Sequence, residues 1–136
     1  MTKIEGGCHC GSVRYTSESD PVMVVNCHCE DCRKSTGSTN SYNLVMPAGT
    51  VTVTGTTITT YVDRNGASGH PMNRHFCSKC ETHFRSEGPG HAGIEMIKGG
   101  TLDHPAGYPP VAYIWCEQKM PWIQIPEGAP QFPRNP

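Results

Sequence analysis

Short segments in which apolar and polar residues alternate recur along the chain, and they predict β-strands. Residues 12–17 place Val13 and Tyr15 on one face with polar residues between them, which is typical of a half-buried strand. Runs rich in β-branched and aromatic residues indicate further strands. They are expected at residues 22–25, 40–46, 50–55, 57–62, 72–76, 82–86, 93–97, 111–116 and 122–125.

The connections between these segments favour turns over helices. Residues 50–55 and 57–62 meet at Gly55 and are expected to form a hairpin. Residues 33–38 are long enough for one helical turn ending at Gly37, and no longer segment has helical periodicity. Residues 126–136 contain four prolines and should run extended over the surface. The pattern therefore predicts an all-β fold.

Composition points to a small, turn-rich domain. The chain has 136 residues, of which 15 are glycine and 12 are proline, so residues 1–136 are expected to form a single domain. A chain with this many turns has a thin core. Bound metal would stabilise it by cross-linking distant turns.

The charge distribution narrows the classes of partner. A net charge of −1 with scattered basic residues predicts no nucleic-acid partner, and the absence of a long apolar segment predicts no membrane span. Residues 1–7 lack the apolar stretch of a signal peptide, so a cytoplasmic location is expected. Thiols stay reduced there, which favours metal ligation by the eight cysteines. Disulfide bonding is the alternative to metal ligation, because the number of cysteines is even.

Seven of the eight cysteines fall into three closely spaced groups. These are Cys8 with Cys10, Cys27 with Cys29 and Cys32, and Cys77 with Cys80. Structural zinc sites draw four ligands as two short-spaced pairs, whereas catalytic sites keep three protein ligands and one open position. The first and last groups would thus form a four-cysteine structural site. The central group would form a second, incomplete site, giving two Zn²⁺ per chain.

Spacing alone leaves other arrangements open. Cys27 and Cys29 could instead pair with another group, or both clusters could be structural, with Cys116 or a histidine as the missing ligand. Cys116 ends an apolar run in which alternation puts it on the same face as Ile114, and it is expected to be a small buried hydrophobe. A methionine sulfoxide reductase would need an exposed nucleophilic cysteine, and only Cys116 is available for that role.

Residues next to the central group suggest how its charge is balanced. Three thiolates on Zn²⁺ leave a net charge of −1, and Arg33 and Lys34 directly follow Cys32. His28 is expected to point away from its cysteine neighbours. The aromatic residues Trp115, Trp122, Tyr108 and Tyr113 are expected in the core or at a pocket.

The motifs, in this order, resemble the glutathione-dependent formaldehyde-activating enzyme family, which includes a centromere protein V branch. The resemblance rests on Gly7 to Tyr15, Cys27 to Cys29, Cys32 to Lys34, Gly37, Phe76 and Cys77, Cys80 with Thr82, Gly99 to Asp103, and Pro121 with Trp122. The sequence departs from the pattern at Glu81, where the family more often has a glycine. The resemblance implies stacked antiparallel sheets with zinc knuckles, similar to methionine sulfoxide reductase B. It also implies a structural zinc on Cys8, Cys10, Cys77 and Cys80 and an active-site zinc on Cys27, Cys29 and Cys32.

The activity implied is that of a zinc-dependent carbon–sulfur lyase. Such an enzyme would form or cleave an adduct between a small thiol such as glutathione and a small aldehyde, for example S-hydroxymethylglutathione. Arg33 and the backbone N–H groups near Gly37 and Ser38 would steady the alkoxide or a glutathione carboxylate. The alternative is a non-catalytic zinc-stabilised module that binds a thiol metabolite or a protein. The oligomeric state is left open.

Overall fold

Two β-sheets and one short α-helix make up most of the ordered structure in this computed structural model, which describes residues 3–136. Met1 and Thr2, which begin the segment expected to lack a signal peptide, lie outside the described residues. The strands are β1 (Ile4–Gly7), β2 (Arg14–Ser17), β3 (Met23–Cys27), β4 (Ser41–Pro47), β5 (Thr52–Thr54), β6 (Ile58–Asp63), β7 (Met72–Cys77), β8 (His83–Glu87), β9 (Ile94–Lys98) and β10 (Ala112–Ile114). The helix α1 spans Glu30–Thr36, and 3-10 turns lie at Pro89–His91, Gly99–Thr101, Pro105–Gly107 and Cys116–Gln118.

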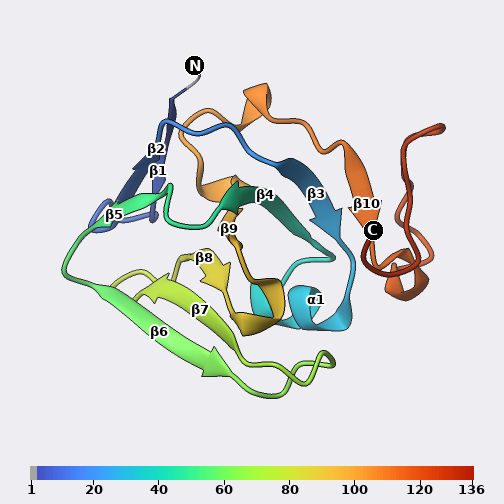
Figure 1. Cartoon of the computed structure of the whole chain (residues 1–136), viewed down its shortest axis with the longest axis horizontal. Coiled ribbons are helices and arrows are strands. Elements are labelled where there is room, and N and C mark those ends of the chain that lie inside the picture. Colours follow the sequence, from blue (N-terminus) through green and yellow to red (C-terminus); the bar gives the residue numbers. More distant parts are fainter. Residues whose placement is uncertain (1–2) are drawn as a thin grey trace.

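The strands form a small and a large sheet. The small sheet has the order β1-β2-β5, and the large sheet has the order β10-β3-β4-β9-β8-β7-β6. Neighbouring strands are antiparallel except for β10, which pairs with β3 in parallel. Figure 1 shows the large sheet curving around α1, which lies on its concave side. The structure is mostly β, which agrees with the predicted all-β fold in its main part, and α1 and the parallel pair are additions to it.

The hydrophobic core lies between the two sheets. Ile4 and Tyr15 from the small sheet pack against Leu44, Phe84 and Ile97 from the large sheet, and all five are buried. The rings of Tyr15 and Phe84 stack with their centroids 6.4 Å apart. Because strand side chains alternate between faces, this contact uses only one face of the large sheet.

The other face of the large sheet carries a different set of residues. In β3 the buried core residue Val24 alternates with Met23 and Val25, and in β9 Ile97 alternates with Met96 and Lys98. Met23, Val25, Met96 and Lys98, which point away from the core, line a cavity that α1 and the loop at 65–71 help to enclose. Side-chain alternation therefore separates the core from the candidate site.

The predicted hairpin of residues 50–55 and 57–62 is wrong. Strand β5 pairs with β2, whereas β6 pairs with β7 in the other sheet. The chain changes sheets at Gly55, which has φ of 143° and whose added Cβ would lie 2.4 Å from the carbonyl oxygen of Ser12. A glycine that read as a hairpin turn is instead a close crossing of two backbones.

Other boundaries also differ from those predicted. The helix begins at Glu30 rather than at residue 33, and residues 4–7, where no strand was predicted, form β1. Residues 122–125 form no strand, because no neighbouring strand supplies hydrogen bonds. Trp122 is 66% exposed, so it is neither a core residue nor a pocket residue.

The C-terminal segment is attached to β10 rather than only extended over the surface. The backbone N–H of Phe132 donates to the Tyr113 carbonyl at 2.9 Å, and the backbone N–H of Trp115 donates to the Arg134 carbonyl at 3.1 Å. Trp115 Nε1 also donates to Asn135 Oδ1 at 2.9 Å. These bonds bring the last residues back to the concave face of the large sheet.

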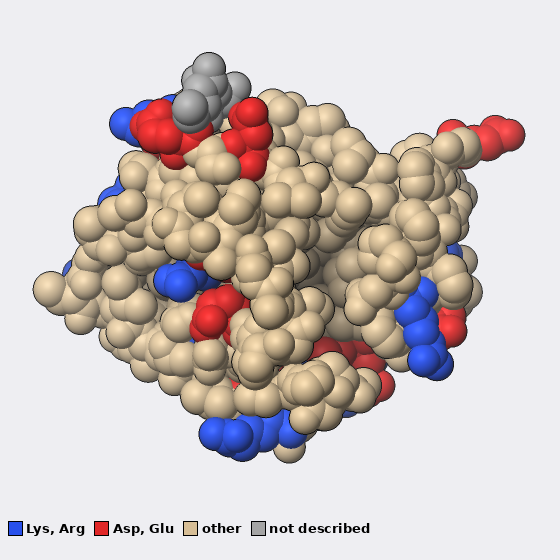
Figure 2. Space-filling view, viewed as in Figure 1, with Lys and Arg blue, Asp and Glu red and all other residues tan. Residues whose placement is uncertain are grey.

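Charged groups on the surface are interspersed. Figure 2 shows acidic and basic side chains in small separate groups on one face. Arg14 pairs with Asp103, and Lys34 pairs with Glu30 across one helical turn; both pairs are exposed and contribute little to stability. None of the described helices is long and apolar enough to cross a membrane.

Candidate metal centres

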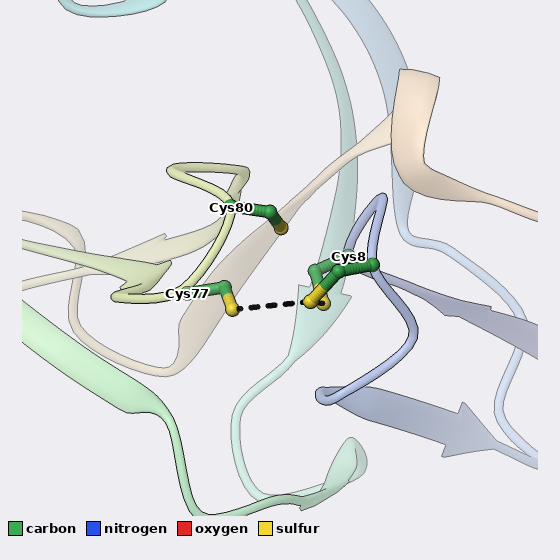
Figure 3. Close-up of side chains that lie close together, drawn as sticks. Cys8, Cys77 and Cys80 are labelled. Carbon is green, nitrogen blue, oxygen red and sulfur yellow. Dashed lines mark hydrogen bonds between the residues drawn. The ribbon is translucent and has the colours of Figure 1, made fainter.

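The sulfur atoms of Cys8, Cys10, Cys77 and Cys80 converge on one point, forming a four-cysteine cluster. All four lie within 4.8 Å of one another. The Sγ atoms of Cys8 and Cys10 are 3.7 Å apart, and those of Cys10 and Cys77 are 3.8 Å apart. Figure 3 shows the labelled Cys8, Cys77 and Cys80 reaching this point from two separate loops. Four thiolates around a tetrahedral ion with bonds of about 2.3 Å would be about 3.8 Å apart, so this cluster could hold such an ion.

Tight turns present these sulfurs. Gly11, at φ of 84°, donates its backbone N–H to the Cys8 carbonyl, and the N–H of Val13 donates to Cys8 Sγ at 3.2 Å. In the second loop the hydroxyl of Thr82 lies 3.3 Å from Cys80 Sγ. A hydrogen bond from this hydroxyl is the main cause that lowers the pKa of Cys80 to about 5. The loop at 77–80 therefore favours the thiolate form of Cys80, which metal binding needs. Burial instead raises the pKa of Cys8 in the first turn.

Glu81 stands where the family more often has a glycine, and its backbone adopts a conformation that glycine favours. Its φ is 69°, the left-handed conformation that costs a residue with a side chain about 1–2 kcal/mol. The backbone N–H of Glu81 closes the loop by donating to the Cys77 carbonyl at 2.8 Å. The loop keeps the conformation that glycine would adopt without strain.

Glu81→Gly should stabilise the protein by up to about 1 kcal/mol, the relief of strain minus the added flexibility of the unfolded chain. Urea denaturation of the metal-loaded protein measures the change. Glu5→Gly, in a strand where φ is not positive, is the matched control and should be destabilising. Equal destabilisation by both variants would contradict this explanation.

The second cluster, of Cys27, Cys29 and Cys32, contains three sulfurs within 4.8 Å of one another. Cys27 is buried at the end of β3, and Cys32 lies in the first turn of α1. Cys29 caps that helix, because its Sγ accepts the backbone N–H of Cys32 at 3.2 Å. A strand end and a helix start thus bring the three sulfurs together without a long loop.

Mutual hydrogen bonding shows how closely the three sulfurs are coupled. The thiol of Cys27 and then that of Cys32 donate to Cys29, which lowers the pKa of Cys29 to about 2. The same contact with Cys29 is the main cause that raises the pKa of Cys27. One thiolate is therefore favoured even without metal, and a cation would favour all three.

Lys98 supplies positive charge beside this cluster. Its side chain is buried, and its Nζ donates to Ser41 Oγ at 3.0 Å and to Asn43 Oδ1 at 3.1 Å. Within residues 3–136 no carboxylate lies within ion-pair distance of it. Burial lowers the pKa of Lys98, and the nearby Cys32 opposes this shift. A buried ammonium without a carboxylate fits beside an anionic sulfur cluster.

A cavity of about 530 Å³ adjoins the three-cysteine cluster. Its wall includes all three cysteines, Lys98 and Trp115. In the four-cysteine cluster, by contrast, four sulfurs could supply all the ligands of a tetrahedral ion. Among the described residues, neither Cys116 nor a histidine joins the three-cysteine cluster. The predicted division of the cysteines into four and three is therefore matched by the geometry.

The other residues predicted to contact substrate lie away from the cavity wall. Arg33 is on α1 but does not line the cavity. The backbone N–H of Gly37 donates to the Arg33 carbonyl at 3.0 Å, and that of Ser38 donates to Thr36 Oγ1 at 3.2 Å. Lys34 is exposed in its pair with Glu30. None of these residues lines the cavity.

His28 and Cys116 lie near the three-cysteine cluster in the sequence, and both make contacts with Tyr113. The imidazole of His28 is buried and stacks on Tyr113 with ring centroids 6.5 Å apart. Cys116 does not line the cavity as Ile114 does, because β10 ends at Ile114, Trp115 adopts φ of 56° and Cys116 starts a 3-10 turn. Cys116 is half-buried, and its thiol donates to the Tyr113 carbonyl at 3.3 Å.

Sequence reasoning missed Lys98, Asn43 and Ser41. Lys98 precedes two glycines, so it read as the exposed end of a strand predicted to stop at residue 97. The available signal was the alternation of residues 94, 96 and 98 in one strand. It places Lys98 on the same face as Ile94 and Met96.

His83 makes stability depend on pH. Burial of the ring, then the nearby charges of Lys98 and Arg74, lower the pKa of His83 to about 3. Between pH 6.5 and 3 the unfolded state therefore binds a proton that the native state does not, so stability falls as pH falls. The loss due to His83 should be about 1–2 kcal/mol at pH 5. Urea denaturation at pH 7.5 and 5 should show a smaller difference in His83→Gln, and an unchanged difference would refute this assignment.

Comparison with known proteins gives consistent relationships. The model of a family described as "Glutathione-dependent formaldehyde-activating enzyme" matches residues 3–118. A Halomonas elongata protein named "Putative glutathione-dependent formaldehyde-activating enzyme" is 31% identical over 126 residues, covering 90% of this chain and 80% of that protein. A crystal structure of a Rhodobacter sphaeroides protein has a TM-score of 0.57 and 18% identity, covering 73% of this chain and 87% of that one. This last similarity concerns the fold alone.

Proposed function

Because the chain belongs to the glutathione-dependent formaldehyde-activating enzyme family, we propose that it is a zinc-dependent carbon–sulfur lyase. Its substrate would be an adduct between glutathione, or a similar thiol, and an aldehyde. The observation that carries the proposal is a cluster of three cysteine sulfurs in the wall of a cavity. Three protein ligands and an open position are typical of catalytic zinc.

The donor sets fit zinc in both clusters. Cys8, Cys10, Cys77 and Cys80 would hold a structural ion, and Cys27, Cys29 and Cys32 would hold a second ion at the cavity. When bound there, zinc supplies a Lewis acid that lowers the pKa of a thiol. The chain's own contribution is to fix three sulfurs on a strand end and a helix start, and to place the charge of Lys98 beside them.

Lys98 would stabilise the oxygen atom of the aldehyde as it gains negative charge. In the direction of adduct formation a C–S bond forms, the carbonyl C=O becomes C–O, and the proton lost by sulfur is balanced by one gained at oxygen. The Lys98 ammonium has three N–H donors, of which Ser41 and Asn43 accept two. The third can donate to a developing alkoxide in the cavity, a form of electrostatic stabilisation that costs little reorganisation.

Trp115 and the C-terminal segment would limit the access of water. Trp115, Asn135 and Pro136 all line the cavity. The indole N–H of Trp115 holds Asn135, and Arg134 lies over the indole ring at 5.7 Å. A bulky residue at positive φ is strained, and such strain is common at functional sites.

Three further expectations belong to this proposal. The stacked sheets and cysteine turns support a fold of the methionine sulfoxide reductase B type. Packing of both sheets around one core supports a single domain over residues 1–136. Eight free cysteines support a reducing, cytoplasmic location.

The test measures exchange between glutathione, formaldehyde and their adduct by NMR, with and without zinc-loaded protein. The adduct forms spontaneously, so the protein must raise the exchange rate, and we expect about 100-fold or more. Cys116→Ser should behave like the unaltered protein because Cys116 is in neither cluster. Glutathione binding without faster exchange would instead identify a non-catalytic module, and absence of binding to the zinc-loaded protein would overturn the proposed use of glutathione.

A further inference from the structure

The floor of the cavity is an ordered array of side chains on the large sheet. Strand pairing sets Cys27 opposite Ser41 in one row. The next row holds Val25, Asn43 and Lys98. Successive rows on one face are separated by two residues, or about 7 Å. The first row beyond the sulfurs therefore carries Asn43 and Lys98, which is bonded back to Ser41 in the Cys27 row.

Beyond this polar row the floor becomes apolar. The third row holds Met23, Val45 and Met96, followed by Ile94 at the start of β9. All four line the same cavity. This region begins about 14 Å from the Cys27 row, so a single carbon attached to sulfur cannot reach it.

The size of the cavity also exceeds what formaldehyde needs. Its volume of about 530 Å³ is within the usual range of about 300–1,000 Å³ for sites that bind whole organic ligands. In the adduct, formaldehyde contributes only a hydroxymethyl group. Leaving the Met23, Val45 and Met96 row uncovered would forgo the burial of apolar surface.

The charged groups of the wall do not favour a second anionic group at this end. Besides Lys98, the wall contains Arg74, whose Nε donates a hydrogen bond to Asp63 Oδ2 at 3.0 Å. It also contains the carboxylates of Glu30 and Asp31. Asp31 is bonded to the backbone N–H of Ala67 at 3.1 Å. Of the two Lys or Arg side chains in this wall, Lys98 is therefore the one without a carboxylate partner among the described residues.

From this arrangement we infer that the aldehyde half of the substrate carries an apolar chain or ring of several carbons. The adduct hydroxyl lies against Lys98 and Asn43, and the apolar substituent extends over Met23, Val45 and Met96. The inference rests on the proposed function and deepens it by naming the class of aldehyde. Addition still forms one C–S bond and moves one proton from sulfur to oxygen.

S-alkylglutathiones test this directly, because the S-alkyl group takes the place of the aldehyde-derived half and cannot react. Calorimetry should measure affinity for the S-methyl, S-butyl and S-hexyl compounds in the zinc-loaded protein and in the metal-free protein. Affinity should rise by about threefold to fourfold for each added methylene that is buried. Equal affinity for the three compounds would overturn the inference while leaving glutathione binding intact.

A blocking variant gives an independent readout. Val45→Phe fills the centre of the apolar row and should reduce S-hexylglutathione affinity at least tenfold while preserving S-methylglutathione affinity. Val62→Phe is the matched control, because Val62 is 40% exposed and does not line the cavity. Circular dichroism checks that both variants fold. Equal affinity of Val45→Phe and the unaltered protein for the S-hexyl compound would refute the assigned position.

The source of the apolar group is decided by a rate comparison. Glutathione with hexanal is compared with hexanethiol with formaldehyde, each corrected for its spontaneous rate. Greater enhancement of the first pair supports the inference, and greater enhancement of the second overturns it by placing the apolar group on the thiol. Failure of every glutathione compound to bind would overturn the proposed function itself.

Discussion

Cys29→Ser should retain one metal ion per chain, lose the other, and reduce adduct exchange to the spontaneous rate. Loss of a mere hydrogen-bond partner of a metal ligand lowers affinity about 10–100-fold. Removal of one of only three sulfur ligands should therefore lower it by at least about 100-fold. The four-cysteine cluster contains no residue of α1 and should keep its ion.

This variant separates metal loss from unfolding. Cys29 is the N-cap of α1, where its sulfur accepts the N–H of Cys32. Serine is among the preferred N-cap residues, so Cys29→Ser should keep the helix. Zinc is measured by mass spectrometry after gel filtration, and affinity by chelator competition, with Cys116→Ser as the control. Two retained ions, or normal exchange with one ion, would refute the assignment of the catalytic centre.

Cys77→Ser should have the largest effect on stability. Cys77 is fully buried at the end of β7, and its sulfur contacts Cys10 Sγ at 3.8 Å and Thr57 Oγ1 at 3.1 Å. Its loss opens the cluster that joins the turn at residues 8–10 to the loop at 77–80. We expect the free energy of unfolding to fall by about 4 kcal/mol or more, a large share of the usual total of about 5–15 kcal/mol.

Urea denaturation with and without a zinc chelator measures this effect. The chelator should strongly destabilise the unaltered protein and Cys116→Ser, and should have little additional effect on Cys77→Ser. Hydrogen exchange should show loss of protection beginning in β7 and in residues 8–13, which the cluster connects. A Cys77→Ser variant with normal stability and normal zinc content would contradict the structural role.

The division of the cysteines could be predicted because metal ligation by short-spaced pairs is a local property. Cys8 with Cys10 and Cys77 with Cys80 each lie on one tight turn, and the structure places these pairs together. Most strands could be predicted for a similar reason, since alternation is visible within a few residues. The features that could be predicted from the sequence are therefore those set by residues a few positions apart.

The pairing of the strands and the residues that line the cavity could not be predicted from local patterns. Gly55 looks like a hairpin turn until the position of Ser12 is known. Lys98 looks like a surface lysine until β9 is placed against β4, where it faces Asn43. Both cases depend on contacts between residues more than forty positions apart. Neither is encoded by a local pattern.

The parallel contact between β10 and β3 has a consequence for biosynthesis. A nascent chain that has emerged as far as Gly100 already carries both cysteine clusters and every strand except β10. It lacks Ile114, whose carbonyl accepts the N–H of His28, and the C-terminal residues that line the cavity. The three thiols are thus open along a sheet edge while the ribosome is still at work, and metal can reach them before the last residues close over it.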